Sequence, residues 1–305
     1  MDIAELLRMR KRGSDVGFIL PTLEEQIVLD AAEDSLHRRR DTFHPSEICR
    51  SDFCPRAWML GYQDPTLYEN QKVPVQLQKK FDVGKMLHKY VQVKLGNAGV
   101  LFGLWECHRM CEGEVCFYFG FNPKKVCDKV CDKAKWKYRE LTVFDPKLNI
   151  RGNIDGVVII GDRKYGLEFK SMNSGSYSTL IQPVESDKEQ SLWYIDVMNR
   201  NGVHEWNEIC TPETTAMYED AQKIIDMPFN GSVVMYMNKD TQDIREFFVE
   251  GTVLDSIEKK KKLLKKTLSQ LKKETLPNRL YLCDEPTAKR AKRCIAVKPC
   301  FREGM

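Results

Sequence analysis

Residues 152–170 constrain the fold more than any other stretch of this sequence. An apolar, β-branched run, Val157–Ile160, is followed by the turn-forming residues Gly161–Lys164 and then by a second short run. Two such runs around a Gly/Asp turn are typical of a β-hairpin. Because side chains alternate between the two faces of a strand, Glu168 and Lys170 are predicted to share one face.

Asp155 is predicted to lie on the partner strand of this hairpin, which would gather two carboxylates and one ammonium at one place. Carboxylate oxygens bind hard divalent cations, and a lysine can orient water or stabilise developing charge. The set therefore suits metal-dependent hydrolysis of a phosphodiester. The simpler alternative for Glu168 and Lys170 is an ion pair on the surface of a strand.

Composition indicates a globular protein of one large domain or two smaller ones. The chain has 305 residues, 42% hydrophobic and 30% charged. It contains no apolar run long enough to span a membrane, and residues 1–12 lack the apolar core of a secretion signal. We therefore expect no membrane partner and a cytoplasmic location. We divide the chain into an N-terminal helical region, 1–43, and a main domain, 44–305.

Basic residues are clustered although the net charge is only +4. Local blocks occur at Arg38–Arg40, at the lysines of 259–273 and at Lys289–Arg293. Most such runs are solvated faces. Beside a phosphodiester-type site, several of them favour a nucleic-acid partner.

Residues 76–95 show the periodicity of a helix, with apolar or small residues recurring at intervals of three and four. The predicted buried stripe runs through Leu77, Phe81, His88 and Val91. A histidine in such a stripe is usually a core side chain with a satisfied ring. A metal site elsewhere in the chain favours the other interpretation, that His88 is a ligand.

Eleven cysteines in a chain without an export signal favour metal binding over disulfides. Two Cys-x3-Cys pairs separated by 15 residues predict a zinc-ribbon-like insertion over 105–135. Its predicted Zn²⁺ ligands are Cys107, Cys111, Cys127 and Cys131. Cys116 and His108 compete for the same four places, and unrelated buried thiols are the alternative.

Further elements follow from pattern. The sequence predicts a strand over 137–144, a helix over 185–199, a strand pair over 233–251 and a lysine-rich helix over 255–274. Near the N-terminus it predicts a helix at Glu24–Arg40, an N-cap at Ser46, Pro55 at the first position of a helix, and a loop at Gly61–Pro74.

Taken together, several separated motifs resemble the PD-(D/E)XK nuclease superfamily. Asp155 followed by Glu168-x-Lys170 is similar to its metal-binding core. Gln190-x3-Tyr194 and His88 resemble motifs of its RecB-like branch. Cys54 with three late cysteines resembles the members that carry an iron–sulfur cluster, such as the CRISPR-associated adaptation nucleases and phage-encoded relatives. The resemblance covers residues 44–300.

The resemblance implies an α/β, restriction-endonuclease-like core, in which a central mixed sheet is flanked by helices. It implies that Asp155, Glu168, His88 and the Phe169 carbonyl bind Mg²⁺ or Mn²⁺. Lys170 would be the catalytic lysine, and Gln190 and Tyr194 would brace the site or touch DNA. A bacterial cell, or one infected by a phage, is the implied location.

The resemblance further implies a [4Fe–4S] cluster that fastens the basic C-terminal segment, 255–305, to the fold. Its ligands would be Cys54, Cys283, Cys294 and Cys300, because such a cluster takes four thiolates. The ten-residue gap between Cys283 and Cys294 is wider than the family pattern. Zinc in this site, no metal, or Cys49 in place of Cys54 therefore stay open.

The function that these expectations favour is a metal-dependent DNA nuclease. It would act as an exonuclease on single-stranded DNA or DNA ends, in recombination, repair or replication, with proteins of those processes as partners. The alternative is a non-catalytic DNA-binding scaffold with a zinc ribbon and a cluster. A redox protein built on the cysteines ranks last, because no Cys-x2-Cys lies in a βαβ context.

Overall fold

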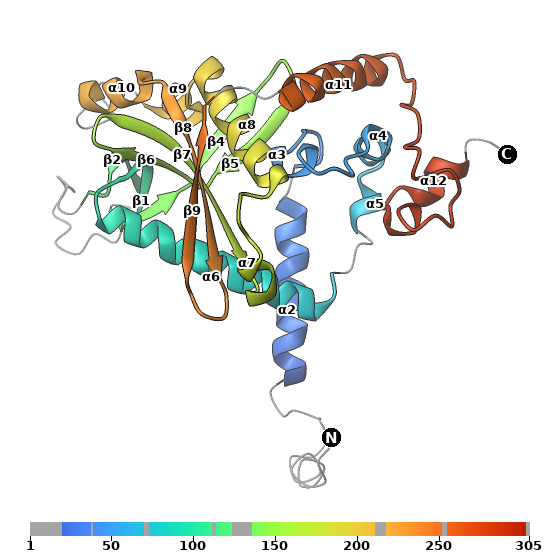
Figure 1. The fold of residues 1–305 in the computed structure, drawn as a ribbon, viewed down its shortest axis with the longest axis horizontal. Helices are drawn as coiled ribbons and strands as arrows, with labels where there is room; N and C mark the ends of the chain where they lie inside the picture. Colours follow the sequence, from blue (N-terminus) through green and yellow to red (C-terminus); the bar gives the residue numbers. More distant parts are fainter. Residues whose placement is uncertain are drawn as a thin grey trace, which may run out of the picture.

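The fold is α/β, with a mixed central sheet flanked by helices (Figure 1). It is seen in a computed structural model that describes residues 20–37, 39–69, 73–111, 114–123, 136–210, 218–251 and 255–302. The helices are α2 (Leu20–His37), α3 (Pro45–Ile48), α4 (Pro55–Gln63), α5 (Thr66–Glu69), α6 (Val75–Asn97), α7 (Ser174–Ser178), α8 (Glu185–Asn201), α9 (His204–Ile209), α10 (Tyr218–Asp226), α11 (Asp255–Lys272), the 3-10 turn η1 (Ala291–Arg293) and α12 (Val297–Arg302).

The central sheet has the strand order β2-β1-β6-β7-β8-β9, and β3 pairs with β1 beside β6. Its strands are β1 (Leu101–Cys111), β2 (Glu114–Phe121), β3 (Trp136–Arg139), β6 (Gly156–Ile160), β7 (Arg163–Met172), β8 (Phe229–Asn238) and β9 (Ile244–Glu250). Only the β7–β8 pair is parallel among the described strands. The connection between them includes α7, α8, α9 and α10, of which α8 packs on both strands. The predicted strand pair near the C-terminus corresponds to β8 and β9.

The predicted hairpin is confirmed as β6–β7, which pair antiparallel around Gly161, whose φ of 64° lies in the region that glycine favours. It is shorter than expected at its start. Residues 150–154 form β5 (Ile150–Ile154), which pairs with β4 (Leu141–Asp145) in a separate two-stranded sheet. Asp155 therefore lies in the bend between two sheets rather than on the partner strand.

The predicted strand over 137–144 is divided in the same way. Residues of β3 pair with β1 in the central sheet, whereas β4 pairs with β5. Glu140 lies between them, where the chain passes from one sheet to the other. Both crossings between sheets, at Glu140 and Asp155, carry a carboxylate.

Helices α6 and α8 cover opposite faces of the central sheet (Figure 1). Phe169 packs with Val91 and Met237 on the α6 side, while Glu168 and Lys170 point to the α8 side. The predicted sharing of faces along β7 is thus confirmed. On α6, however, Leu77 and Phe81 are exposed, and the buried positions are Gln78, Val91, Gln92 and Gly96.

Several N-terminal helices begin or end at other residues than the sequence predicted. Helix α2 runs over Leu20–His37, with Pro21 in its first turn. His44 precedes α3 and Pro45 opens it, so the predicted cap at Ser46 is wrong. Pro55 does open α4 as predicted. The region predicted as a loop, 61–74, includes the end of α4 and all of α5.

The structure does not show residues 105–135 as a separate insertion, as far as it describes them. Residues 105–111 belong to β1, and 114–121 to β2, so both are part of the central sheet. The Cys107 side chain is buried in that sheet. Cys111 lies on β1 by its backbone, whereas Cys127 and Cys131 lie outside the described residues. The zinc site stays a prediction.

The C-terminal segment returns to the N-terminal half of the domain. Helix α11 packs on α8 and α4 through Ile257 and Leu264, and α12 packs on α4 (Figure 1). Among the described helices, none has the length and apolar character needed to cross a bilayer.

Candidate metal and nucleic-acid site

Asp155 is held firmly at the bend between β5 and β6. Its Oδ2 accepts a hydrogen bond of 2.7 Å from the backbone N–H of Phe169 on β7. This contact ties the bend to the strand that carries Glu168 and Lys170. The sheet thus brings together the three residues that the sequence singled out.

Glu168 and Lys170 form a chain of polar contacts that reaches α8. The Lys170 ammonium lies 2.6 Å from Oε1 of Glu168 and donates to Oε1 of Gln190 at 3.3 Å. Nε2 of Gln190 in turn donates to the Tyr194 hydroxyl at 3.0 Å. The Gln190 and Tyr194 pair predicted from sequence therefore restricts the position of the Lys170 ammonium. The other oxygen of Glu168, Oε2, is buried and has no hydrogen-bond partner among the described residues.

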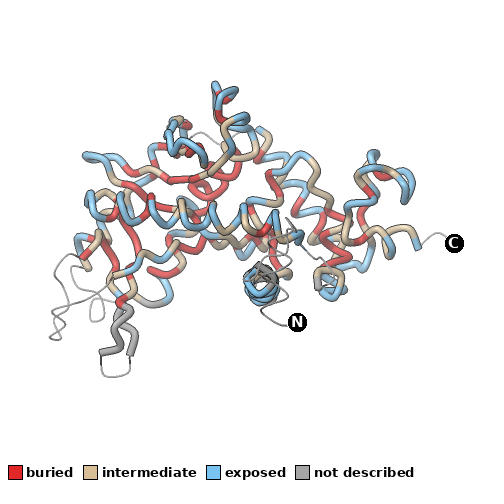
Figure 2. The backbone as a smooth tube through the Cα atoms, turned by 90° about the horizontal axis from the view of Figure 1, so that it is seen from below, coloured by how far each residue is buried: buried red, intermediate tan, exposed pale blue. Residues whose placement is uncertain are grey.

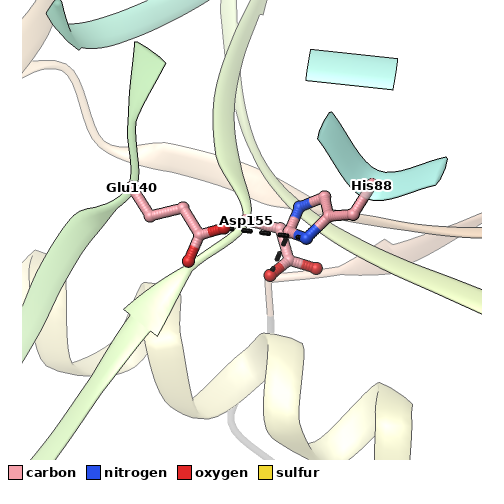
Figure 3. Close-up of side chains that lie close together, drawn as sticks. All are labelled: His88, Glu140 and Asp155. Carbon is pink, nitrogen blue, oxygen red and sulfur yellow. Dashed lines mark ion pairs between the residues drawn. The ribbon is translucent and has the colours of Figure 1, made fainter. Parts of the chain in front are cut away.

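His88 reaches the site from α6 (Figure 3). Its Nε2 lies 3.7 Å from Oδ1 of Asp155, and its Nδ1 lies 3.6 Å from Oε1 of Glu140. One ligand atom from each of these three side chains lies within 4.8 Å of the others. His88 is also stacked on Phe169, with ring centroids 5.6 Å apart. His88 thus lies beside Asp155, and its role as a metal ligand stays a prediction.

Glu140 is a site residue that the sequence interpretation missed. Gln92, one turn after His88 on α6, donates from Nε2 to Oε1 of Glu140 at 3.3 Å and to the Asp155 carbonyl at 2.8 Å. The available signal was the charged pair Arg139-Glu140, which interrupts the alternation of the predicted strand.

The site holds more carboxylates than cationic side chains. Burial, together with the neighbouring Asp155, raises the pKa of Glu168 well above its ordinary value. Burial and Glu140 raise the pKa of Asp155 to about 7. Burial lowers the pKa of Lys170, but the Glu168 carboxylate outweighs it and raises the pKa overall. Glu168 and Asp155 thus act on one ammonium, and Glu140 adds a further negative charge beside Asp155. A divalent cation would relieve the repulsion among these carboxylates.

Burial lowers the pKa of His88, and the Glu140 carboxylate opposes this shift. A neutral imidazole keeps a lone pair for a metal or a proton. Beyond this group, Asp187 in the first turn of α8 accepts a 2.9 Å hydrogen bond from Tyr236, and its charge acts on Glu168 and Lys170. Sequence periodicity could not reveal Asp187, because its orientation depends on how α8 lies on the sheet.

The four cysteines assigned to one cluster come from α4 and the C-terminal segment. Burial raises the pKa of Cys294, and the thiols of Cys54 and Cys300 act on it in the same sense. Arg290 donates to the Cys283 sulfur at 3.4 Å, and Arg56 on α4 donates to the Cys300 sulfur at 3.3 Å. Charges of Cys54 and Cys283 both act on Arg290. Among the described residues, the group of three or more ligating side chains within 4.8 Å of one another is His88, Glu140 and Asp155, so the cysteine site stays a prediction.

Cys49, the alternative to Cys54, lies in a different environment. It is buried, which raises its pKa, and the charged groups acting on it include Lys260, Glu189 and Glu168. These belong to the carboxylate site and to the contact between α8 and α11. Cys49 and Cys54 thus lie in different surroundings, and the choice between them as a ligand stays open.

Part of the basic surface is already engaged within the protein. Lys260 contacts Glu189, and Lys261 lies 3.0 Å from Asp196, so these two lysines of α11 bind α8. Other basic side chains remain exposed on α11 and after it, namely Lys259, Lys262, Lys265, Lys266, Lys289, Lys292, Arg293 and Lys298.

No protein-family model matches this chain, and no curated protein sequence matches it significantly. Among solved structures, the crystal structure of SSO0001 is similar over 93% of this chain and 98% of its own. The sequence identity is 14% and the TM-score is 0.42. The functional interpretation therefore depends on the geometry of this chain itself.

Proposed function

We propose that this chain is a metal-dependent deoxyribonuclease of the PD-(D/E)XK superfamily, in the RecB-like branch, with a restriction-endonuclease-like core. One observation carries the proposal. Asp155, Glu168 and Lys170 converge with His88, and Glu168 keeps one buried oxygen without a partner among the described residues. A buried carboxylate oxygen in that state is costly unless a cation or a proton is bound to it.

The donor set fits Mg²⁺ or Mn²⁺, which prefer oxygen ligands with one or two imidazoles at most. Asp155, Glu168, His88 and the Phe169 carbonyl would hold the cation, and Glu140 adds a further carboxylate. A divalent cation there would neutralise charge on the scissile phosphate and acidify the attacking water.

Lys170 has the position of the catalytic ammonium. Its contacts with Glu168 and Gln190 keep it charged and restrict its rotamers. An ammonium held in this way can orient the attacking water and stabilise negative charge as it develops. Tyr194 stabilises the arrangement through Gln190.

The thiols of Cys54, Cys283, Cys294 and Cys300 form a donor set of the size that a [4Fe–4S] cluster or a zinc ion requires. Arg56 and Arg290 donate to two of the sulfurs, which suits an anionic centre. Such a group would fasten the C-terminal segment to α4. Metal analysis and the visible absorption of freshly purified protein distinguish iron–sulfur from zinc, and replacing each cysteine with serine in turn should remove the bound metal.

The substrate that fits is DNA, as a single strand or an end. The exposed lysines of α11 and the basic residues after it would bind the phosphate backbone, so affinity should fall steeply with salt. Replication or recombination proteins are the natural partners of such an activity.

The decisive experiment is a cleavage assay with single- and double-stranded DNA labelled at the 5′ or 3′ end, in Mg²⁺, Mn²⁺ or EDTA. We expect cleavage that EDTA abolishes and that Asp155→Asn and Lys170→Met reduce by at least about a hundredfold. Asp162→Asn, in the exposed turn of the same hairpin, and Lys147→Met, on the surface, are matched controls. Cleavage by Asp155→Asn at the normal rate would contradict the proposal. DNA binding without cleavage in any metal would favour the non-catalytic scaffold.

A further inference from the structure

Helix α6 carries an outward stripe that the described residues of this chain leave uncovered for most of its length. Lys79, Val83, Met86, Tyr90 and Val93 follow one another at intervals of four, three, four and three residues. This spacing places them on one face of the helix. The four apolar members are exposed by 38%, 64%, 55% and 55%, in that order. Figure 2 looks at the molecule from the side on which α6 lies.

The first position of the stripe is already in contact with α2. Glu24 of α2 lies 2.7 Å from the Lys79 ammonium, and α2 packs across the beginning of α6 before it extends away from the body (Figure 1). In this contact the acidic helix α2 packs against the basic helix α6. From Val83 onward the stripe continues beyond this contact.

Both helices carry the charges needed to repeat that contact. On α6, Lys89 and Lys94 are exposed beside the stripe, and the Lys94 ammonium lies 5.3 Å from the Tyr90 ring. The outward face of α2 has Val28 and Leu29, exposed by 44% and 56%.

The exposed carboxylates Glu25 and Glu33 lie on the same outward side of α2, one turn before and one turn after its apolar pair. An apolar pair between carboxylates thus faces outward on one helix, and an apolar stripe beside lysines faces outward on the other.

We infer that a second copy of this chain covers the stripe. The outward face of α2 from each protomer would pack on residues 83–93 of the other, in a reciprocal, two-fold arrangement of four helices. Pairing of α6 with α6 would place lysines against lysines, which disfavours it. The chain supplies both complementary surfaces, and one contact of the same kind exists within each protomer. The inference is independent of the nuclease proposal.

Light scattering coupled to gel filtration, over a wide range of protein concentration, tests the inference. The chain has a mass of 35.5 kDa, and we expect the wild type at about twice that value. Met86→Glu with Tyr90→Glu, or Leu29→Lys alone, should raise the dissociation constant by at least about tenfold. Ile181→Glu is the control, because Ile181 is 88% exposed and lies outside α2 and α6.

Charge exchange separates a specific contact from a merely disturbed surface. A variant with Glu25→Lys and Glu33→Lys, and another with Lys89→Glu and Lys94→Glu, should each be monomeric alone and form a dimer with each other. These positions are exposed, so unchanged thermal unfolding should confirm that both variants fold. A wild-type monomer at every concentration, or a dimer that all the variants leave intact, would overturn the inference.

Discussion

Asp155 combines burial, a backbone hydrogen bond and two neighbouring carboxylates. It accepts from Phe169, while Glu140 and Glu168 repel its charge. An asparagine has the same shape and can still accept from Phe169, but it carries no charge. The same substitution that tests catalysis therefore also tests how far the site is strained by its own charges.

We expect Asp155→Asn to stabilise the cation-free protein. Burial raises the pKa of Asp155 from 3.8 to about 7, so between these values the folded chain binds a proton that the unfolded chain has lost. This group's contribution to stability is therefore lost as pH rises from about 4 to about 7. The gain in Asp155→Asn should be small near pH 4 and roughly 2–4 kcal/mol at pH 8.

Thermal unfolding in EDTA at several pH values measures this gain, with Asp162→Asn as the control in the exposed turn. Added Mn²⁺ should stabilise the wild type and leave Asp155→Asn nearly unchanged. Equal melting temperatures for the wild type and Asp155→Asn at every pH would show that the carboxylates do not repel one another as the geometry indicates.

At the scale of single residues, motif spacing identified Asp155, Glu168, Lys170, Gln190 and Tyr194 as neighbours. Spacing succeeded because Glu168 and Lys170 lie on one strand and Gln190 and Tyr194 on one helix, where local periodicity fixes orientation. Asp155 lies in the bend directly before the partner strand. Glu140 was missed because it lies where the chain passes between two sheets, and no local pattern encodes that crossing. Asp187 was missed because its neighbours come from β7 and β8.

Helix α8 is the element on which the polar part of the site depends, and α11 holds it in place. Lys260 contacts Glu189 and Lys261 contacts Asp196, and all four side chains are buried or half-buried. Glu189 precedes Gln190 directly. The lysine-rich helix α11 is therefore not only a solvated face. It also holds α8, the helix whose Gln190 contacts Lys170.

We expect Lys260→Met to destabilise the protein by about 1–3 kcal/mol, because it leaves the buried Glu189 carboxylate without its cation. Combined with Glu189→Gln, it should show a coupling energy of about 1 kcal/mol or more in a double-mutant cycle from urea unfolding. Since the pair is mostly buried, the coupling should persist at high salt. Lys262→Met, at an exposed position of the same helix, is the control. Additive effects of the two substitutions would show that the contact has no role in stability.

Elements with strong periodicity were predictable, and their connections were not. The β6–β7 hairpin, α6, α8 and α11 all appear close to their predicted positions. The exposed side of α6 was misjudged, because Leu77 and Phe81 have the right spacing for a core stripe but face away from the sheet. Apolar spacing does not distinguish a buried face from one that α2 or another molecule covers.

At the scale of the whole molecule, the C-terminal segment closes onto α4. Arg56, buried on α4, donates to the Pro277 carbonyl at 3.0 Å as well as to the Cys300 sulfur. Arg290 donates in the opposite direction, from the C-terminal segment to the Asp52 carbonyl. Guanidinium groups thus join the two regions reciprocally. The resemblance implied that these regions meet, but nothing in the sequence marked the two arginines.

We expect Arg56→Met to loosen the C-terminal segment, because the Pro277 carbonyl and the Cys300 sulfur lose their donor. Limited proteolysis followed by mass spectrometry should show faster cleavage within 277–302, by about tenfold, while the β6–β7 core stays protected. Lys298→Met, at an exposed position in the same segment, is the control. Unchanged cleavage would show that other contacts suffice to hold the segment.

The contacts of Arg56 also imply an order in which parts of the fold form during synthesis. Two of its acceptors, the carbonyls of Pro277 and Cys300, follow 221 and 244 residues later in the chain, so α4 leaves the ribosome long before these two contacts can form. Contacts of such separation raise contact order and slow folding. Until residues 277–300 have been synthesised, the part of α4 that they contact in the folded protein is exposed to solvent. A chain interrupted before residue 277 would therefore keep an uncovered surface on α4 that chaperones and proteases can recognise.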